Sequence, residues 1–171
     1  QHLQRAALQR ARSMAQADDV LTGDRLAAAW LRTGDARLAE EQTRAELEHV
    51  PSRRRTRLLR AEALLRMGQG SDAMRALEPL LSGAGPEDAD AALLKARVQL
   101  AQNDTLDAQK LARRLATSTA VSPLVRAGAQ RVLGRVSLIL GEPAAARRAL
   151  EPLVRQMAGV TVAPGDLEMR E

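Results

Sequence analysis

The sequence predicts an all-α fold, and three observations lead to that prediction. Alanine, leucine, arginine, glutamine and glutamate, all strong helix formers, dominate the chain of 171 residues. Apolar residues recur three or four positions apart, as at Leu93, Ala96 and Leu100. Strand patterns are nearly absent, and the one β-leaning stretch is 160–162. The chain is therefore expected to be built from helices alone.

The predicted helices follow one another in pairs. Each pair is broken near its middle by a glycine or asparagine, which tolerates the left-handed conformation that ends a helix. The breaks lie at 34–35, 68–70, 103–104 and 141–143. They divide the chain into four predicted repeats, at residues 20–53, 54–88, 89–126 and 127–158. Residues 1–19 are expected to form a further helix, either a cap or the second helix of a preceding repeat, and 159–171 a tail or the start of another repeat. Both ends favour a segment of a longer repeat protein.

A regular spacing connects these pairs. Gly34 and Gly68 are 34 residues apart, and so are Ala39 and Ala73. The segments 75–81 and 148–154 are close to copies of each other. A fixed period of this length indicates a repeat architecture, in which each pair buries its apolar stripe against its neighbours.

The repeats resemble the tetratricopeptide (TPR) family, including its bacterial members. The family's small residue in the first helix falls at Ala27, Ala61, Ala96 and Gly134. The alanine of its second helix falls at Ala39, Ala73, Ala108 and Ala146. Trp30 and Leu64 stand at the aromatic site, from which Gln99 and Ser137 depart. The resemblance implies a right-handed superhelical solenoid of about four antiparallel helix pairs plus an N-terminal helix.

Composition narrows the possible functions. The chain has no cysteine, so thiolate metal sites, disulfides and thiol nucleophiles are excluded. No stretch approaches the roughly 20 apolar residues that cross a bilayer, so no membrane insertion is expected. The two histidines lack the companions that a metal site or a catalytic dyad needs. We therefore expect no enzyme, no catalytic residue, no cofactor and no metal.

The densest unusual feature is a basic cluster at the start of the second repeat. Its members are Arg53, Arg54, Arg55, Arg57 and Arg60, behind Ser52 as the expected N-cap. Cations in a first helical turn oppose the helix dipole. The cluster is either an anchor for an acidic peptide, phosphate or anionic polymer, or a solvated helix start paired with Glu46 and Glu48. Nucleic acid is a poor match, because stacking aromatics are missing.

The family resemblance implies a concave groove lined by the first helices. Carried over position by position, the partner-binding residues are Leu58, Glu62, Leu65, Arg66, Leu93, Arg97, Leu100, Arg131, Arg135 and Leu138, and Arg55 joins them from the basic cluster. The groove is expected to have a leucine floor with arginines along it. The leucines could instead pack between adjacent first helices.

These features favour a non-enzymatic scaffold that binds a partner peptide or helix with apolar and acidic residues. Two alternatives stay open: a regulatory or sensor segment of a larger bacterial transcription regulator, and a periplasmic scaffold of a secretion or polysaccharide-export machine. The expected location is the bacterial periplasm or cell envelope, or else the cytoplasm, with a preference for the envelope. The oligomeric state is left open.

Overall fold

The computed structural model describes residues 20–82 and 88–158, and within these ranges the chain is entirely helical. The all-α prediction is therefore confirmed for this part of the chain. The eight helices described are α2 (Val20–Thr33), α3 (Ala36–His49), α4 (Arg54–Arg66), α5 (Gly70–Leu81), α6 (Ala89–Ala101), α7 (Thr105–Thr117), α8 (Pro123–Ile139) and α9 (Pro143–Ala158). The expected N-terminal helix 1–19, the tail 159–171 and the loop 83–87 lie outside the described residues.

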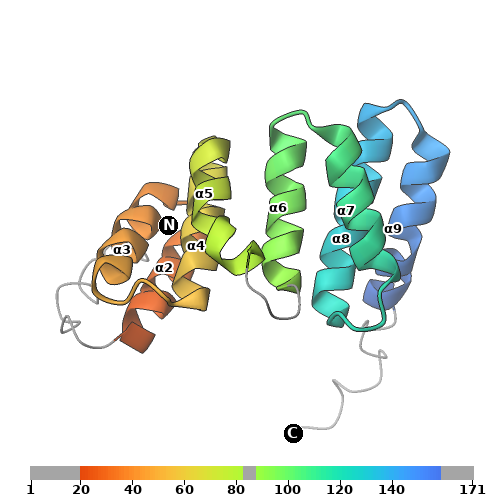
Figure 1. The fold of residues 1–171 in the computed structure, drawn as a ribbon. Coiled ribbons are helices and arrows are strands. Elements are labelled where there is room, and N and C mark those ends of the chain that lie inside the picture. Colours follow the sequence, from red (N-terminus) through yellow and green to blue (C-terminus); the bar gives the residue numbers. More distant parts are fainter. Residues whose placement is uncertain (1–19, 83–87, 159–171) are drawn as a thin grey trace, which may run out of the picture.

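The helices form four consecutive pairs: α2 with α3, α4 with α5, α6 with α7, and α8 with α9. Figure 1 shows them following one another in chain order across the molecule. The turn inside each pair contains a residue with positive φ, at Gly34, Gly68, Asn103 and Gly141. The next residue donates its backbone N–H to a carbonyl five positions back, for example Asp35 to Trp30 at 2.9 Å. This is a Schellman ending, which satisfies the free carbonyls of the first helix and reverses the chain.

Small residues lie where the paired helices cross. Ala27, Ala61 and Ala96 are fully buried in the first helices, and Gly134 packs so tightly that a Cβ there would lie 2.7 Å from Leu150 Cγ. The second-helix alanines at 39, 73, 108 and 146 are also buried. Large residues fill the space around these crossings; Trp30 and Leu77, for example, have no exposed surface. The apolar core is therefore a row of clusters between successive helices.

The first and second helices of the pairs differ in their long-range neighbours. Each first helix also contacts the first helix of the next pair, in the series α2, α4, α6 and α8. Within the described residues, no two of the second helices α3, α5, α7 and α9 contact each other. The stack is therefore closed along its first helices and open along its second helices.

Two helix starts differ from the sequence expectation. The N-cap of α4 is Arg53 rather than Ser52, and its side chain makes no capping hydrogen bond. The fourth pair begins at Pro123, four residues before the expected boundary at 127. There Ser122 caps the helix by accepting a hydrogen bond from the Val125 N–H at 3.2 Å, and proline fits the first helical position because it needs no donor. In residues 20–82 and 88–158, no helix has the length and apolar character to span a bilayer.

Candidate functional site

A pocket of about 380 Å³ lies between the first helices of the last three pairs. We call it the α4–α6–α8 pocket. Its lining side chains come from three helices that are far apart in sequence. They are Glu62 and Arg66 from α4, Leu93, Arg97 and Leu100 from α6, and Gly128, Arg131, Val132 and Arg135 from α8.

Helical spacing explains why these residues share one face. Each helix contributes a pair four positions apart, Arg131 and Arg135 on α8 for example, and such residues lie one above the other on a helix. Gly128 lets α6 approach: a Cβ there would lie 2.5 Å from Leu93 Cδ2. The absent side chain therefore makes room for Leu93 at the edge of the pocket.

Glu62 organises the α4 and α6 side of the pocket. Its carboxylate accepts two hydrogen bonds from Arg97, from Nη1 at 2.5 Å and from Nη2 at 3.0 Å. It also accepts one from Arg66 Nε at 2.9 Å, while Arg66 Nη1 donates to the backbone oxygen of Leu31. Two of the four arginines that line this pocket are thus held in place by one acid.

The α8 side has the opposite character. Arg131 and Arg135 are exposed, and neither makes an ion pair or hydrogen bond with any residue in the described part of the chain. The reason lies in the repeat itself. Glu62, Arg97 and Arg135 each stand one residue after the small residue of successive first helices. Arg97 therefore faces a carboxylate on the preceding helix, whereas the equivalent position that precedes Arg135 is itself Arg97. The lining has four arginines and one glutamate, a net charge of +3.

The structure brings together seven of the eleven residues expected in the groove. These are Glu62, Arg66, Leu93, Arg97, Leu100, Arg131 and Arg135. The sequence patterns singled out neither Gly128 nor Val132, which also line the pocket. Both positions follow from helical spacing: Gly128 lies three positions before Arg131 and four positions before Val132, so all three share one side of α8.

The expected leucine floor is not a continuous surface. Leu100 is only 8% exposed and belongs to the core between α6, α7 and α8. Leu58 and Leu65 are half-buried, and both pack against the core between α4, α5 and α6. Leu138 is 59% exposed but lies outside the pocket. Leu58, Leu65 and Leu100 therefore pack in cores that first and second helices share, while Leu93 lines the pocket.

The basic cluster does not form one cationic surface, because its arginines have separate neighbours. Arg54 binds the Asp88 carboxylate through Nε and Nη2 and Asp90 at 2.6 Å, and these hydrogen bonds raise the pKa of its guanidinium. Arg55 lies 3.8 Å from Asp24. The expected partners, Glu46 and Glu48, are not the acids in these pairs.

The remaining members of the cluster also have neighbours within the chain. Arg57 Nε donates to the Pro51 carbonyl at 2.8 Å, and Arg60 lies 3.3 Å from Glu40. Arg53 lies close enough to Glu46 for its charge to lower the pKa of that carboxyl. Burial is the larger effect, however, and leaves the pKa of Glu46 above its ordinary value.

A buried hydrogen bond lies next to the cluster. Thr56 Oγ1 donates to Asp24 Oδ1 at 2.8 Å, and the Asp24 side chain is only 8% exposed. This bond and the Arg55 pair join the start of α4 to α2. The first turn of α4 therefore fixes the chain to both neighbouring pairs, through Asp24 on one side and Asp88 on the other.

A signal for these contacts is present in the sequence. Asp24 and Thr56, Arg54 and Asp88, and Glu62 and Arg97 are separated by 32, 34 and 35 positions respectively, close to one repeat. Opposite charges about one repeat apart would have pointed to the pairs Arg54–Asp88 and Glu62–Arg97, and a hydroxyl opposite a carboxylate to Thr56 and Asp24.

Within the described residues, no three side chains of histidine, aspartate or glutamate gather as a metal site would require. No protein-family model, curated protein or solved structure matches this chain. The α4–α6–α8 pocket is therefore interpreted from its own geometry and charge.

Proposed function

We propose that this chain is a non-enzymatic interaction module whose α4–α6–α8 pocket binds an acidic segment of a partner protein. The observation that carries the proposal is the pair Arg131 and Arg135, which face the pocket without a described intramolecular partner. Guanidinium groups form bidentate hydrogen bonds with carboxylates, so these two residues suit aspartate or glutamate side chains.

The charge of the pocket sets the character of the partner. With a net charge of +3 in its lining, the pocket attracts acidic chains and repels basic ones. Leu93 and Val132 add a limited apolar surface beside the arginines. We infer that the partner segment alternates acidic with apolar residues, as an extended peptide or one face of a helix would.

The architecture supports the same proposal. First helices that touch and second helices that do not would give the stack a curve, with the first helices on its inner side. A TPR-like, right-handed superhelix has this asymmetry, and the α4–α6–α8 pocket would then lie in its concave groove. The chain would act by holding its partner rather than by changing it chemically.

A peptide selection tests the proposal. A displayed library of random 12-residue peptides is selected on the immobilised chain, and the affinities of the recovered peptides are measured by fluorescence anisotropy. We expect enrichment of Asp and Glu beside Leu and Ile. The double variant Arg131→Glu and Arg135→Glu should weaken binding by more than about 30-fold, since each lost charged hydrogen bond is worth roughly 1.5–3 kcal/mol.

The matched control is Arg147→Glu with Arg148→Glu on α9. This variant has the same change in net charge, and its arginines are exposed and lie outside the described pockets. It should leave the affinity within about twofold, because only long-range attraction is lost. Peptides without acidic enrichment, or equal weakening in both double variants, would refute the assignment of this pocket.

A further inference from the structure

A second pocket, of about 480 Å³, lies between α3, α4 and α5. We call it the α3–α4–α5 pocket. Its lining residues are Glu40, Arg44, Arg57, Arg60, Leu64, Met67, Gln69, Asp72, Arg75 and Ala76. It occupies the opening that two second helices leave when they do not touch, and a first helix forms its floor.

The two pockets lie on opposite faces of α4. At about 100° per residue, Glu62 and Arg66 fall on one side of this helix. Arg57, Arg60 and Leu64 fall on the other side, and the two linings share no residue. The α3–α4–α5 pocket is therefore separate from the site of the proposed partner.

Arginines dominate this second lining. Arg44 comes from α3, Arg57 and Arg60 from α4, and Arg75 from α5, with Glu40 and Asp72 as the only acids. The lining thus has a net charge of +2. Confining like charges in a pocket lowers stability unless an anion compensates them.

Existing contacts hold three of the four guanidiniums but leave donors free on each. Arg60 lies 3.3 Å from Glu40, Arg75 pairs with Asp72, and Arg57 uses its Nε for the Pro51 carbonyl. A guanidinium has five N–H donors, so a single acceptor leaves most of them available. Arg44 has no hydrogen bond or ion pair with any residue of the described ranges.

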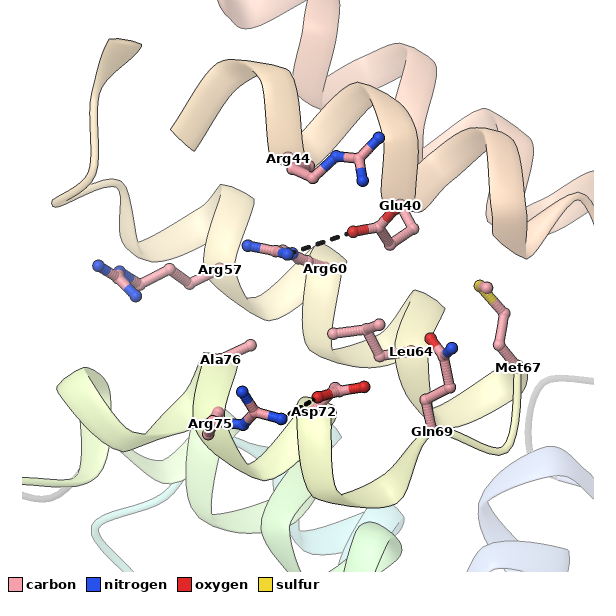
Figure 2. Close-up of a pocket in the computed structure, with 10 residues that line it drawn as sticks. All are labelled: Glu40, Arg44, Arg57, Arg60, Leu64, Met67, Gln69, Asp72, Arg75 and Ala76. Atoms are coloured by element: carbon pink, nitrogen blue, oxygen red, sulfur yellow. Dashed lines mark hydrogen bonds and ion pairs between the residues drawn. The ribbon is translucent and has the colours of Figure 1, made fainter. Parts of the chain in front are cut away.

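Figure 2 shows how these groups are arranged around the pocket. Arg44 and Glu40 project from α3, Arg75 and Asp72 from α5, and Arg60 extends between them toward Glu40. Leu64, Met67 and Gln69 lie together at one end of the pocket. The lining therefore combines a cationic part with a smaller, partly apolar end.

We propose that the α3–α4–α5 pocket binds a small organic phosphate monoester. A phosphomonoester has a charge near −2 at neutral pH and three acceptor oxygens, which match the net charge and the free guanidinium donors of the lining. Its organic part would lie against Leu64 and Met67. The volume lies in the range of small-ligand sites, about 300–1,000 Å³.

An NMR titration tests this site directly. Phenyl phosphate is added to the ¹⁵N-labelled chain at low ionic strength, and the amide shifts are followed to saturation. We expect shifts centred on residues 40–76 and a Kd of about 1 mM or lower. Inorganic phosphate should bind at least threefold more weakly, because it lacks the apolar part, and benzoate more weakly still, because it has one charge.

Arg44→Gln is the informative variant and Arg113→Gln its control. Both residues are exposed, both substitutions remove one charge, and Arg113 lies on α7 outside the described pockets. Arg44→Gln should weaken phenyl phosphate binding by about fivefold or more, because a charged hydrogen bond is lost. Arg113→Gln should change it by less than twofold.

Three results would overturn the proposal. The first is no saturable shift at about 10 mM phenyl phosphate, and the second is equal weakening by the two variants. The third is inorganic phosphate binding as tightly as phenyl phosphate, which would leave no role for an organic part. Shifts centred on α8 instead would assign the anion to the α4–α6–α8 pocket and exclude this one.

Discussion

Helices α4 and α8 both present arginines to their surroundings, but the two groups differ in what already binds them. Around the start of α4, Arg54 and Arg55 have acidic neighbours on adjacent first helices, and Arg57 has a backbone carbonyl. On α8, Arg131 and Arg135 have no such neighbour in the described part of the chain. Arg54 and Arg55, two members of the denser cluster in the sequence, thus hold adjacent repeats together.

This difference shows that density of charge along a sequence is a poor guide to a binding site in a stacked repeat. First helices bring positions about one repeat apart into contact, so the acids that bind Arg54 and Arg97 are found 34 and 35 positions away. Arginines with an acid at that distance stabilise the stack. Arg131 and Arg135 have no such contact within the described residues, and we propose them as the arginines that bind another molecule.

The largest effect on stability is expected from removing the Thr56 hydroxyl, which tests whether the start of α4 holds adjacent pairs together. We expect Thr56→Val to lower the free energy of unfolding by about 2 kcal/mol, because buried Asp24 loses its donor at 2.8 Å. Urea denaturation followed by circular dichroism measures the loss. Thr117→Val is the control, since that hydroxyl is exposed and bonds only within its own helix. Equal losses in the two variants would mean that the start of α4 does not tie the pairs together.

A smaller, pH-dependent effect is expected from Arg54→Gln. Burial alone would raise the pKa of Asp88, but hydrogen bonds from Arg54 and from the N–H groups of Ala91 and Asp90 lower it below its ordinary value of 3.8. The ionised carboxylate is therefore favoured by folding, and its contribution is complete above pH 3.8 and lost as the pH falls through the folded-state pKa.

We therefore expect Arg54→Gln to cost about 1 kcal/mol at pH 7, discounted because Arg54 is half exposed. The difference from the parent chain should shrink as the pH falls below 3.8. Denaturant melts between pH 7 and pH 2.5 measure it. A difference that stays constant over this range would show that the Asp88 carboxylate is not the relevant partner.

The smallest effect on stability is expected on α8. Arg131→Gln with Arg135→Gln should change the free energy of unfolding by less than about 0.5 kcal/mol, because no described contact is lost. The same urea melts measure it. A loss of 1 kcal/mol or more would show that these arginines stabilise the fold, and would remove the main support for the proposed partner site.

Much of the helical framework could be predicted from local chemistry. The first helix of each pair ends at a residue in the left-handed conformation, at Gly34, Gly68, Asn103 and Gly141. Glycine and asparagine tolerate this conformation, so the residue type alone predicts the helix end. The alanines at the crossings could also be identified in the sequence, because they recur at a fixed interval. The helix ends depend on residues near in sequence, and the crossing alanines depend on one repeating interval.

The candidate site could be predicted only in part. Arg97, Arg131 and Arg135 were expected together from the offsets that the family resemblance implies, and the structure brings all three to one pocket. Residues four positions apart, such as Arg131 and Arg135, share a helix face whatever the neighbouring helices do. The roles of Glu62 and Arg54 could not be found from local patterns, since their bonds depend on how neighbouring pairs stack. The burial of Leu100 could not be found for the same reason, because it is decided by contacts with α7 and α8 and not by its own helix.

Glu62 also connects two of the helix pairs. Its carboxylate binds Arg97 and so connects α4 to α6, which belong to the second and third pairs. An acid that bound Arg97 in the proposed site would compete with Glu62 for the same guanidinium. The proposed partner site and the contact between the second and third pairs would therefore share one side chain, Arg97.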